Sequence, residues 1–340
     1  MYESFYRLRA KPFSLNPDPT FFFGSKGHNR AMSYLEYGLH QGEGFIVITG
    51  EVGAGKTTLV KNLFRRLDAS GLVAAQLVST QLDADDTLRM VAASFGLPHE
   101  DNNKAALLKR LESFLLSCAE QGRRALLVVD EAQNLTPRAL EELRMLSNFH
   151  SGGRSLLQTF LLGQPEFRLT MQGAGMTQLR QRVIASYHLG PLDAEDTRGY
   201  IRHRLETAGW ADDPSIAEEC HQEIFAFTGG IPRRVNTLCD RLLLMGYIEE
   251  KHALGPQEVK DVIQDIQKEN TLPDGILRVP AAPSTIGVSH SMVVDEKRDA
   301  QIAALEDRVS DLERSVTQLL KLLREIVSVA GVRRVRGEEH

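Results

Sequence analysis

The chain has 340 residues, of which 42% are hydrophobic and 25% charged, which is enough for about two soluble domains of ordinary size. Its formal net charge of −5 excludes a global basic field that would draw it to nucleic acid or anionic lipid. The three cysteines form no CxxC pair and no run of about 18 apolar residues appears. We therefore expect a cytoplasmic protein whose membrane association is at most peripheral, at the inner face of the cytoplasmic membrane.

Four short apolar runs that contain β-branched residues, and a weaker fifth run, follow the first 40 residues of the chain. They are FIVIT (45–49), VAAQLV (73–78), ALLVVD (125–130), LLQTFLL (156–162) and the weaker SYHL (186–189). Helical patterns separate these runs, and strands that alternate with helices predict a parallel sheet covered by helices on both faces. We therefore expect an α/β domain over residues 41–192, preceded by an N-terminal linker segment at 1–40.

The first run leads into GEVGAGKTT (50–58), and a helical pattern follows. This matches the phosphate-loop pattern GxxxxGK[ST], whose glycines let backbone N–H groups turn inward around phosphate at the start of a helix. Lys56 is expected to reach the β- and γ-phosphates of ATP, and the Thr57 hydroxyl to bind Mg²⁺. The strand–loop–helix context disfavours a glycine turn that binds nothing. The expected nucleotide-binding residues are Gly50, Glu51, Val52, Gly53, Ala54, Gly55, Lys56, Thr57 and Thr58.

The third run ends at Asp130, and a second carboxylate, Glu131, follows it directly. Asp130 is expected to hold Mg²⁺ through water, and Glu131 to polarise the water that attacks ATP. The competing interpretation is an acidic cap on the next helix, TPRALEELRML, where acidic residues are favourable in any case. An intact phosphate loop upstream favours the catalytic interpretation.

Three further polar residues follow in the same domain. Gln164 lies just beyond the fourth run, at the expected tip of the strand, where a polar side chain can orient water near the γ-phosphate; the alternative is an ordinary turn residue. Arginine just before the last strand can project into a neighbouring subunit and neutralise transition-state charge. We expect Arg182, or failing that Arg180, to act in this way, the alternative being a pair of solvated helix arginines.

From about residue 193 the pattern changes to four helical stretches separated by Gly and Pro, which predicts an all-α lid domain over residues 193–270. Within it, TGGIPRRVNT (228–237) ends one helix at two glycines and opens the next at Pro232. Basic residues are mildly unfavourable in a first turn, so Arg233 is expected there for another purpose. If the lid folds over the nucleotide, Arg233 is expected to contact the γ-phosphate. The position of the lid would then differ between the ATP-bound and the ADP-bound protein.

Residues 271–294 carry several prolines and small residues and are expected to be a flexible linker. A coiled coil is predicted at 295–332, because apolar residues then alternate at spacings of three and four. The alternative is an amphipathic helix packed on its own domain. The predicted seam has Ile302, Val309, Val316 and Leu323 at a, and Leu305, Leu312, Leu319 and Ile326 at d.

The order of these motifs resembles that of AAA+ ATPases. Over about residues 1–268 the chain is similar to the GspA/ExeA secretion-ATPase family, through FYRLRAKPFSLNPDPTFFFGSKGHNRAMSYLEYGL, GEVGAGKTTL, DEAQNL, LLGQPEFR, LRQRV and GGIPRRVNTLCD. The spacing of these motifs and their residues resemble most those of the subfamily linked to PEP-CTERM/exosortase exopolysaccharide loci. The resemblance implies that the stretch from Pro19 to Phe23 packs near the nucleotide base, with a plain hydrophobic anchor as the alternative. GspA/ExeA proteins carry a membrane span and a peptidoglycan-binding domain where this chain has the expected linker and coiled coil.

We therefore expect a Mg²⁺-dependent ATPase that forms a homo-oligomer and couples its nucleotide state to an envelope export or polysaccharide assembly complex. Two alternatives stay open. One is a DNA-binding ATPase similar to transposition helpers, although the net charge of −5 makes nucleic acid an unexpected partner. The other is a coiled-coil scaffold that nucleotide switches.

Overall fold

The computed structural model describes residues 1–66, 71–78, 83–100 and 103–270, all within one compact unit, Met1–Asp274. The linker expected at 271–294 and the coiled coil expected at 295–332 lie outside the described residues. Within the described ranges, no helix combines the length and the apolar character needed to cross a membrane.

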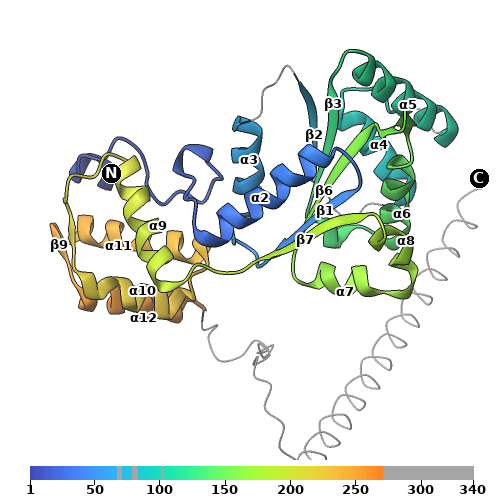
Figure 1. Ribbon diagram of the computed structural model, residues 1–340. Coiled ribbons are helices and arrows are strands. Elements are labelled where there is room, and N and C mark those ends of the chain that lie inside the picture. The colour runs from blue at the N-terminus through green and yellow to red at the C-terminus, as the bar shows by residue number, and fades with distance from the viewer. Residues whose placement is uncertain (67–70, 79–82, 101–102, 271–340) are drawn as a thin grey trace, which may run out of the picture. The chain divides into compact units, whose positions relative to one another are not determined.

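Among the described residues, five strands form the parallel sheet at the centre of the first domain (Figure 1). In spatial order they are β2 (Leu72–Val78), β3 (Arg124–Asp130), β6 (Leu157–Gly163), β1 (Phe45–Gly50) and β7 (Val183–Leu189). β1 and β6 are buried along their whole length, which explains why their sequences are mostly apolar and do not alternate between apolar and polar residues. The expected parallel sheet is confirmed; β7 begins at Val183, earlier than expected.

Helices cover both faces of this sheet, as expected. Side chains alternate between the faces, so Phe45 and Val47 of β1 join one apolar cluster while Ile46 and Ile48 join the other. The first face packs against α4 (Ala84–Ser94), α5 (Lys104–Glu120), α6 (Pro137–Leu146), α7 (Glu166–Gln172) and α8 (Thr177–Arg180). The second packs against α2 (Lys26–Gln41) and α3 (Lys56–Arg66).

Helix α2 lies close against β1 and begins beside the phosphate loop. The close approach depends on Gly38, where a Cβ would stand 2.4 Å from Cγ1 of Ile46. The Ser25 hydroxyl caps the helix by accepting a hydrogen bond from the N–H of His28. Residues 25–28 therefore hold a fixed position relative to the sheet.

Short elements connect the larger ones. They are η1 (Pro19–Phe21), η2 (Ala132–Asn134), η3 (Ala174–Met176) and an antiparallel hairpin of β4 (His150–Ser151) and β5 (Arg154–Ser155). Gly152 and Gly153 close this hairpin with φ angles of 57° and 78°, the left-handed conformation that tight hairpins require.

Residues 193–270, the lid domain, contain the four expected helices. These are α9 (Ala194–Thr207), α10 (Glu218–Thr228), α11 (Pro232–Ile248) and α12 (Pro256–Asn270). The lid is not purely helical, because β8 (Ser215–Ile216) pairs in parallel with β9 (Ala253–Leu254). The helical pattern of the second stretch, PSIAEECHQEIFAFTGG, begins at Pro214, but the pairing of β8 with β9 takes up the residues that follow Pro214, so α10 begins only at Glu218.

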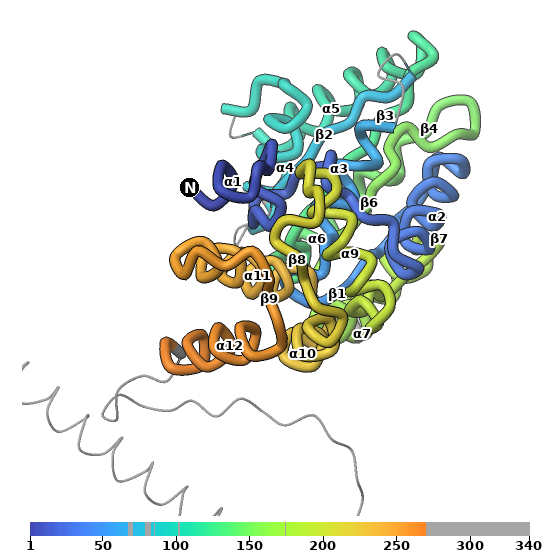
Figure 2. The backbone as a smooth tube through the Cα atoms, turned by 90° about the vertical axis from the view of Figure 1, so that its left-hand side faces the viewer, coloured from blue at the N-terminus to red at the C-terminus, as the bar shows by residue number. Residues whose placement is uncertain are grey.

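The N-terminal residues pack with the lid and not with the sheet. Helix α1 (Tyr2–Phe5) lies beside α11 (Figures 1 and 2), and the Tyr2 hydroxyl donates a hydrogen bond of 2.6 Å to Asp240. Tyr6 and Phe13 are buried in the apolar cluster of the lid. The chain then returns to the first domain through residues 14–25, which we call the N-terminal strap.

The strap ends where α2 begins, and the first residue of α2 contacts the start of the lid. The Lys26 ammonium lies 2.8 Å from Glu195 and 3.4 Å from Asp193, and the Lys26 N–H donates to Asp196. These acidic residues belong to the first turn of α9 and its cap, immediately after the connection from β7. The two segments that join the domains therefore meet at this point.

Candidate nucleotide-binding site

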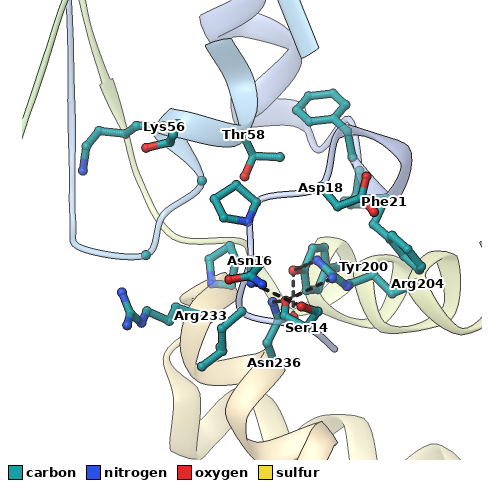
Figure 3. Close-up of a pocket in the computed structure, with 18 of the residues that line it drawn as sticks. Ser14, Asn16, Asp18, Phe21, Lys56, Thr58, Tyr200, Arg204, Arg233 and Asn236 are labelled. Atoms are coloured by element: carbon teal, nitrogen blue, oxygen red, sulfur yellow. Dashed lines mark hydrogen bonds between the residues drawn. The ribbon is translucent and has the colours of Figure 1, made fainter. Parts of the chain in front are cut away.

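A cavity of about 190 Å³ lies between the first domain and the lid. Figure 3 shows the strap residues Ser14, Asn16 and Asp18 between the phosphate loop on one side and α9 and α11 on the other. Of the expected nucleotide-binding residues, Val52, Gly53, Gly55, Lys56, Thr57 and Thr58 line the cavity, whereas Gly50, Glu51 and Ala54 do not.

The phosphate loop joins β1 to α3 through two glycines in the left-handed region. Gly53 has a φ of 82° and Gly55 a φ of 97°. Lys56 is buried and folds back over the loop, where its ammonium donates to the main-chain oxygens of Gly50 at 2.6 Å and Glu51 at 3.0 Å. Burial lowers the pKa of Lys56, although nearby carboxylates oppose the shift. A bound phosphate would offer this amine a stronger partner than the carbonyls.

Thr57 and Asp130 meet at the carboxyl end of the central strands. The Thr57 hydroxyl donates a hydrogen bond of 2.8 Å to one carboxylate oxygen of Asp130, which is buried. The other oxygen accepts the N–H of Glu131 at 3.0 Å. A hydroxyl and a carboxylate are the oxygen ligands that Mg²⁺ prefers, and two protein ligands leave room for phosphate oxygens and water. The residues present therefore fit the expected metal.

Glu131 lines the cavity and is held by two glutamines. Its carboxylate accepts 2.6 Å and 3.1 Å hydrogen bonds from the side-chain amides of Gln133 and Gln164. The Gln164 N–H in turn donates to the Gln133 side-chain oxygen at 2.9 Å. Burial alone would raise the pKa of Glu131, but these two hydrogen bonds and the charge of Lys56 outweigh it and hold the pKa below its usual value.

Gln133 is a site residue that the sequence analysis missed. Its signal is its place two residues beyond Glu131, where the chain leaves β3 through η2. Glu131 has a φ of 56°, a left-handed conformation unusual for a side-chain-bearing residue. This turn aims Gln133 and Glu131 at each other, a geometry that spacing alone does not reveal.

Arg233 contacts the phosphate loop from the lid. Its N–H donates to the Gly53 oxygen at 3.2 Å, and a Cβ on Gly53 would stand 2.3 Å from the Arg233 Cβ. Pro232 opens α11 as expected, so Arg233 lies in the first turn. Its side chain is exposed and lines the cavity. The structure thus brings Arg233 to the loop of the same chain, while its expected γ-phosphate role stays a prediction.

Arg180 and Arg182 do not line the cavity. The Arg182 guanidinium bonds the Ser147 oxygen at 3.2 Å and also contacts the Asn148 side chain. Arg180 is exposed, and its guanidinium is held by the main-chain oxygens of Met171 at 2.7 Å and Gly173 at 3.0 Å. In this structure neither arginine is therefore placed to contact a nucleotide in the cavity of its own chain. The expected action on a neighbouring subunit stays a prediction.

The strap, which includes η1, forms the wall of the cavity opposite the phosphate loop. Phe21, Phe22 and Phe23 all line it, so the stretch expected near the nucleotide base does face the cavity. The role of this stretch at the base stays a prediction.

A buried polar network that the sequence analysis missed holds the strap to the lid. Arg204 of α9 donates to the main-chain oxygens of Pro12 and Ser14, and Asn236 of α11 donates to the same Ser14 oxygen. The Tyr200 hydroxyl links them, accepting from Arg204 and donating to Asn236, both at 2.8 Å. All three side chains are buried. The network makes the strap part of the lid at this end of the cavity.

Comparisons with known proteins agree with this geometry. The AAA domain profile matches residues 39–171. General secretion pathway protein A of Aeromonas hydrophila is 35% identical over 281 residues, which cover 82% of this chain and 51% of that protein. The chain therefore spans about half the length of this relative.

Two solved structures illustrate the fold that this chain shares with known proteins. The ORC2 protein of Aeropyrum pernix, in complexes with ADPNP and ADP, has a TM-score of 0.58 at 17% identity, with 77% of this chain and 74% of that chain covered. Cdc6p of Pyrobaculum aerophilum has a TM-score of 0.57 at 15% identity, with the same shares covered. At these identities the likeness shows a shared fold, the P-loop AAA fold.

Proposed function

Because the chain contains an AAA domain with the P-loop AAA fold and is related to general secretion pathway protein A, we propose that it is a Mg²⁺-dependent ATPase that converts ATP and water to ADP and phosphate. One observation supports this most strongly. The cavity joins a phosphate loop, a hydroxyl–carboxylate pair of metal-ligand type and a carboxylate, Glu131, which two glutamines hold in its charged form.

Each group has a defined task in this proposal. The ammonium of Lys56 leaves its carbonyl partners and binds the β- and γ-phosphates. Mg²⁺, when bound, neutralises charge on the same phosphates, and Thr57 and Asp130 would hold it. Glu131 accepts a hydrogen bond from the attacking water and polarises it, while Gln164 helps to orient that water. The depressed pKa of Glu131 keeps it ionised for this task at neutral pH.

The lid and a second subunit supply cations. We propose that Arg233 contacts the γ-phosphate and that loss of this phosphate releases α11 from the loop. We propose further that the protein forms a homo-oligomer in which an arginine acts in trans. Arg180 suits this role better than Arg182, because it is the exposed member of the pair.

The cellular role that fits best is support of an envelope export or exopolysaccharide assembly system, through a protein partner. The relation to a general secretion pathway protein supports a role in export. The residues of the motifs support membership of the exosortase-associated subfamily. Because only about half of that relative is matched, its remaining functions do not transfer to this chain.

Two substitutions test the ATPase proposal. Lys56→Ala should weaken ATP binding, because a phosphate contact is removed. Glu131→Gln should keep ATP binding and lose turnover, because the amide neither polarises water nor carries charge. Glu112→Gln, at an exposed position on α5, is the matched control and should leave both unchanged. Hydrolysis by Glu131→Gln at the wild-type rate would exclude Glu131 as the catalytic base.

A further inference from the structure

His28 lies in the first turn of α2 and packs against the phosphate loop. The residue is 6% exposed, and both ring nitrogens have partners. Nδ1 lies 2.7 Å from the Ser25 hydroxyl, and Nε2 lies 3.0 Å from the main-chain oxygen of Ala54. A histidine far from the phosphate-loop sequence therefore contacts the loop directly.

These partners determine the tautomer of the ring. A main-chain oxygen only accepts hydrogen bonds, so Nε2 of His28 carries the proton that is donated to Ala54. Nδ1 of the neutral ring then accepts a hydrogen bond from the Ser25 hydroxyl. The same hydroxyl oxygen accepts a hydrogen bond of 3.2 Å from the main-chain N–H of His28. Burial lowers the pKa of His28, although the bond to Ala54 opposes the shift, so the neutral ring is favoured.

The bond to Ala54 sets the direction of the peptide that joins Ala54 to Gly55. In a trans peptide the C=O and the N–H point in opposite directions. Because His28 holds the oxygen, the Gly55 N–H points away from the imidazole. Gly55 stands just before the first turn of α3, where backbone N–H groups have no partner within the helix and are available to an anion.

The ring and the loop also fit each other sterically. A Cβ on Gly55 would stand 2.7 Å from Nε2 of His28, so the ring lies directly against the backbone of the loop. On another side, Phe22 meets the ring edge-on, with 5.9 Å between the ring centroids. Contacts from α2, the strap and the loop therefore hold the imidazole in one place.

We propose that His28 is a positioning residue for the phosphate loop, which holds the Ala54 carbonyl so that the Gly55 N–H faces the β-phosphate of a bound nucleotide. This inference rests on the proposed nucleotide binding, and it adds a residue that the phosphate-loop pattern does not contain. Its consequence is selective: His28 strengthens binding of nucleotides that carry a β-phosphate and leaves binding of base and ribose unchanged.

The test compares substitutions of similar size in the full chain. His28→Gln keeps an N–H donor near the position of Nε2, whereas His28→Met has none. ADP affinity is measured by calorimetry, and AMP affinity by competition against a fluorescent ADP analogue. We expect His28→Met to weaken ADP binding about tenfold, because a buried carbonyl loses its donor, and AMP binding less than about twofold. His28→Gln should lie between His28→Met and wild type.

His40→Gln is the matched control, since His40 is exposed near the end of the same helix, and it should bind ADP like wild type. Equal losses of ADP and AMP affinity in His28→Met would show that the ring only supports the cavity. Unchanged ADP affinity in that variant would show that the carbonyl needs no donor. Either result overturns the proposal.

Ser25 keeps the proposal testable if the His28 variants do not fold. Ser25→Ala removes the hydroxyl that donates to Nδ1 of His28 and helps to hold the ring, so we expect a smaller loss of ADP affinity with the same selectivity over AMP, restored by Ser25→Thr. An unchanged ratio of ADP to AMP affinity in Ser25→Ala would reject the inference alone. A wild-type protein that binds no ADP would reject the proposed function and this inference with it.

Discussion

The contact between the lid and the phosphate loop predicts a large effect of Gly53→Ala. The φ of 82° at Gly53 costs an alanine about 1–2 kcal/mol. In addition, the new Cβ would stand 2.3 Å from the Arg233 Cβ, whereas carbon atoms pack at about 3.5–4.0 Å. The lid must therefore retreat by more than about 1 Å, which also breaks the hydrogen bond from the Arg233 N–H, worth about 1 kcal/mol. We expect a total loss of about 2–3 kcal/mol in the free energy of unfolding.

A control and a double-mutant cycle separate the two effects. Gly122 has a φ of 71°, and a Cβ added to it would meet nothing within 4 Å, so Gly122→Ala should show the backbone cost alone. Arg233→Gly removes the opposing Cβ, and in that background Gly53→Ala should cost no more than Gly122→Ala. Urea unfolding followed by circular dichroism and by the fluorescence of Trp210, a lid residue, measures each variant. Equal costs for Gly53→Ala and Gly122→Ala, with additivity in the cycle, would refute a close contact between loop and lid.

Three more predictions concern the site. Gln133→Leu should raise the pKa of Glu131, because one of the hydrogen bonds that oppose the effect of burial is lost. The acidic limb of the pH profile of ATP turnover should therefore move to higher pH, and an unmoved limb would contradict this. Arg204→Met should lower the free energy of unfolding in urea by about 1–3 kcal/mol, because the buried carbonyls of Pro12 and Ser14 lose their donor. A decrease below about 0.5 kcal/mol would show that the network does not stabilise the protein. Arg180→Ala should lower ATP turnover in the assembled protein without changing ATP affinity, more than Arg182→Ala does; equal wild-type rates would exclude both arginines.

Much of the fold is predictable because its central strands β1, β3 and β6 are buried on both faces. FIVIT and ALLVVD have no polar face, so each predicts a strand that is covered on both sides. The phosphate loop between a strand and a helix then predicts which edge of the sheet carries the site. The lid helices are predictable from Gly and Pro at their joints. The pairing of β8 with β9 is not, because two-residue strands carry no periodicity.

The parts of the site that sequence reasoning missed depend on contacts between distant segments. His28 and Ala54 are separated by 26 residues, and Arg204 contacts Pro12 across 192 residues. A lone histidine or an arginine in an amphipathic helix has the same local pattern whether it is solvated or buried. Gln133 was missed for another reason: its partner Glu131 is close in sequence, but the left-handed turn between strand and η2 decides the direction of both side chains.

The lid is joined to the first domain by two covalent segments, the N-terminal strap and the connection from β7 to α9, which meet where Lys26 contacts Glu195. A rigid body tethered at one point can turn about any axis, but one held along two neighbouring segments keeps mainly the rotation about the line between them. Nucleotide-dependent motion of the lid is therefore expected to be a swing of fixed direction. Under the proposed role of Arg233, such a swing would convert a change of a few ångströms at this residue into a repeatable displacement at the distant end of α11, as transmission of force to the proposed protein partner would require.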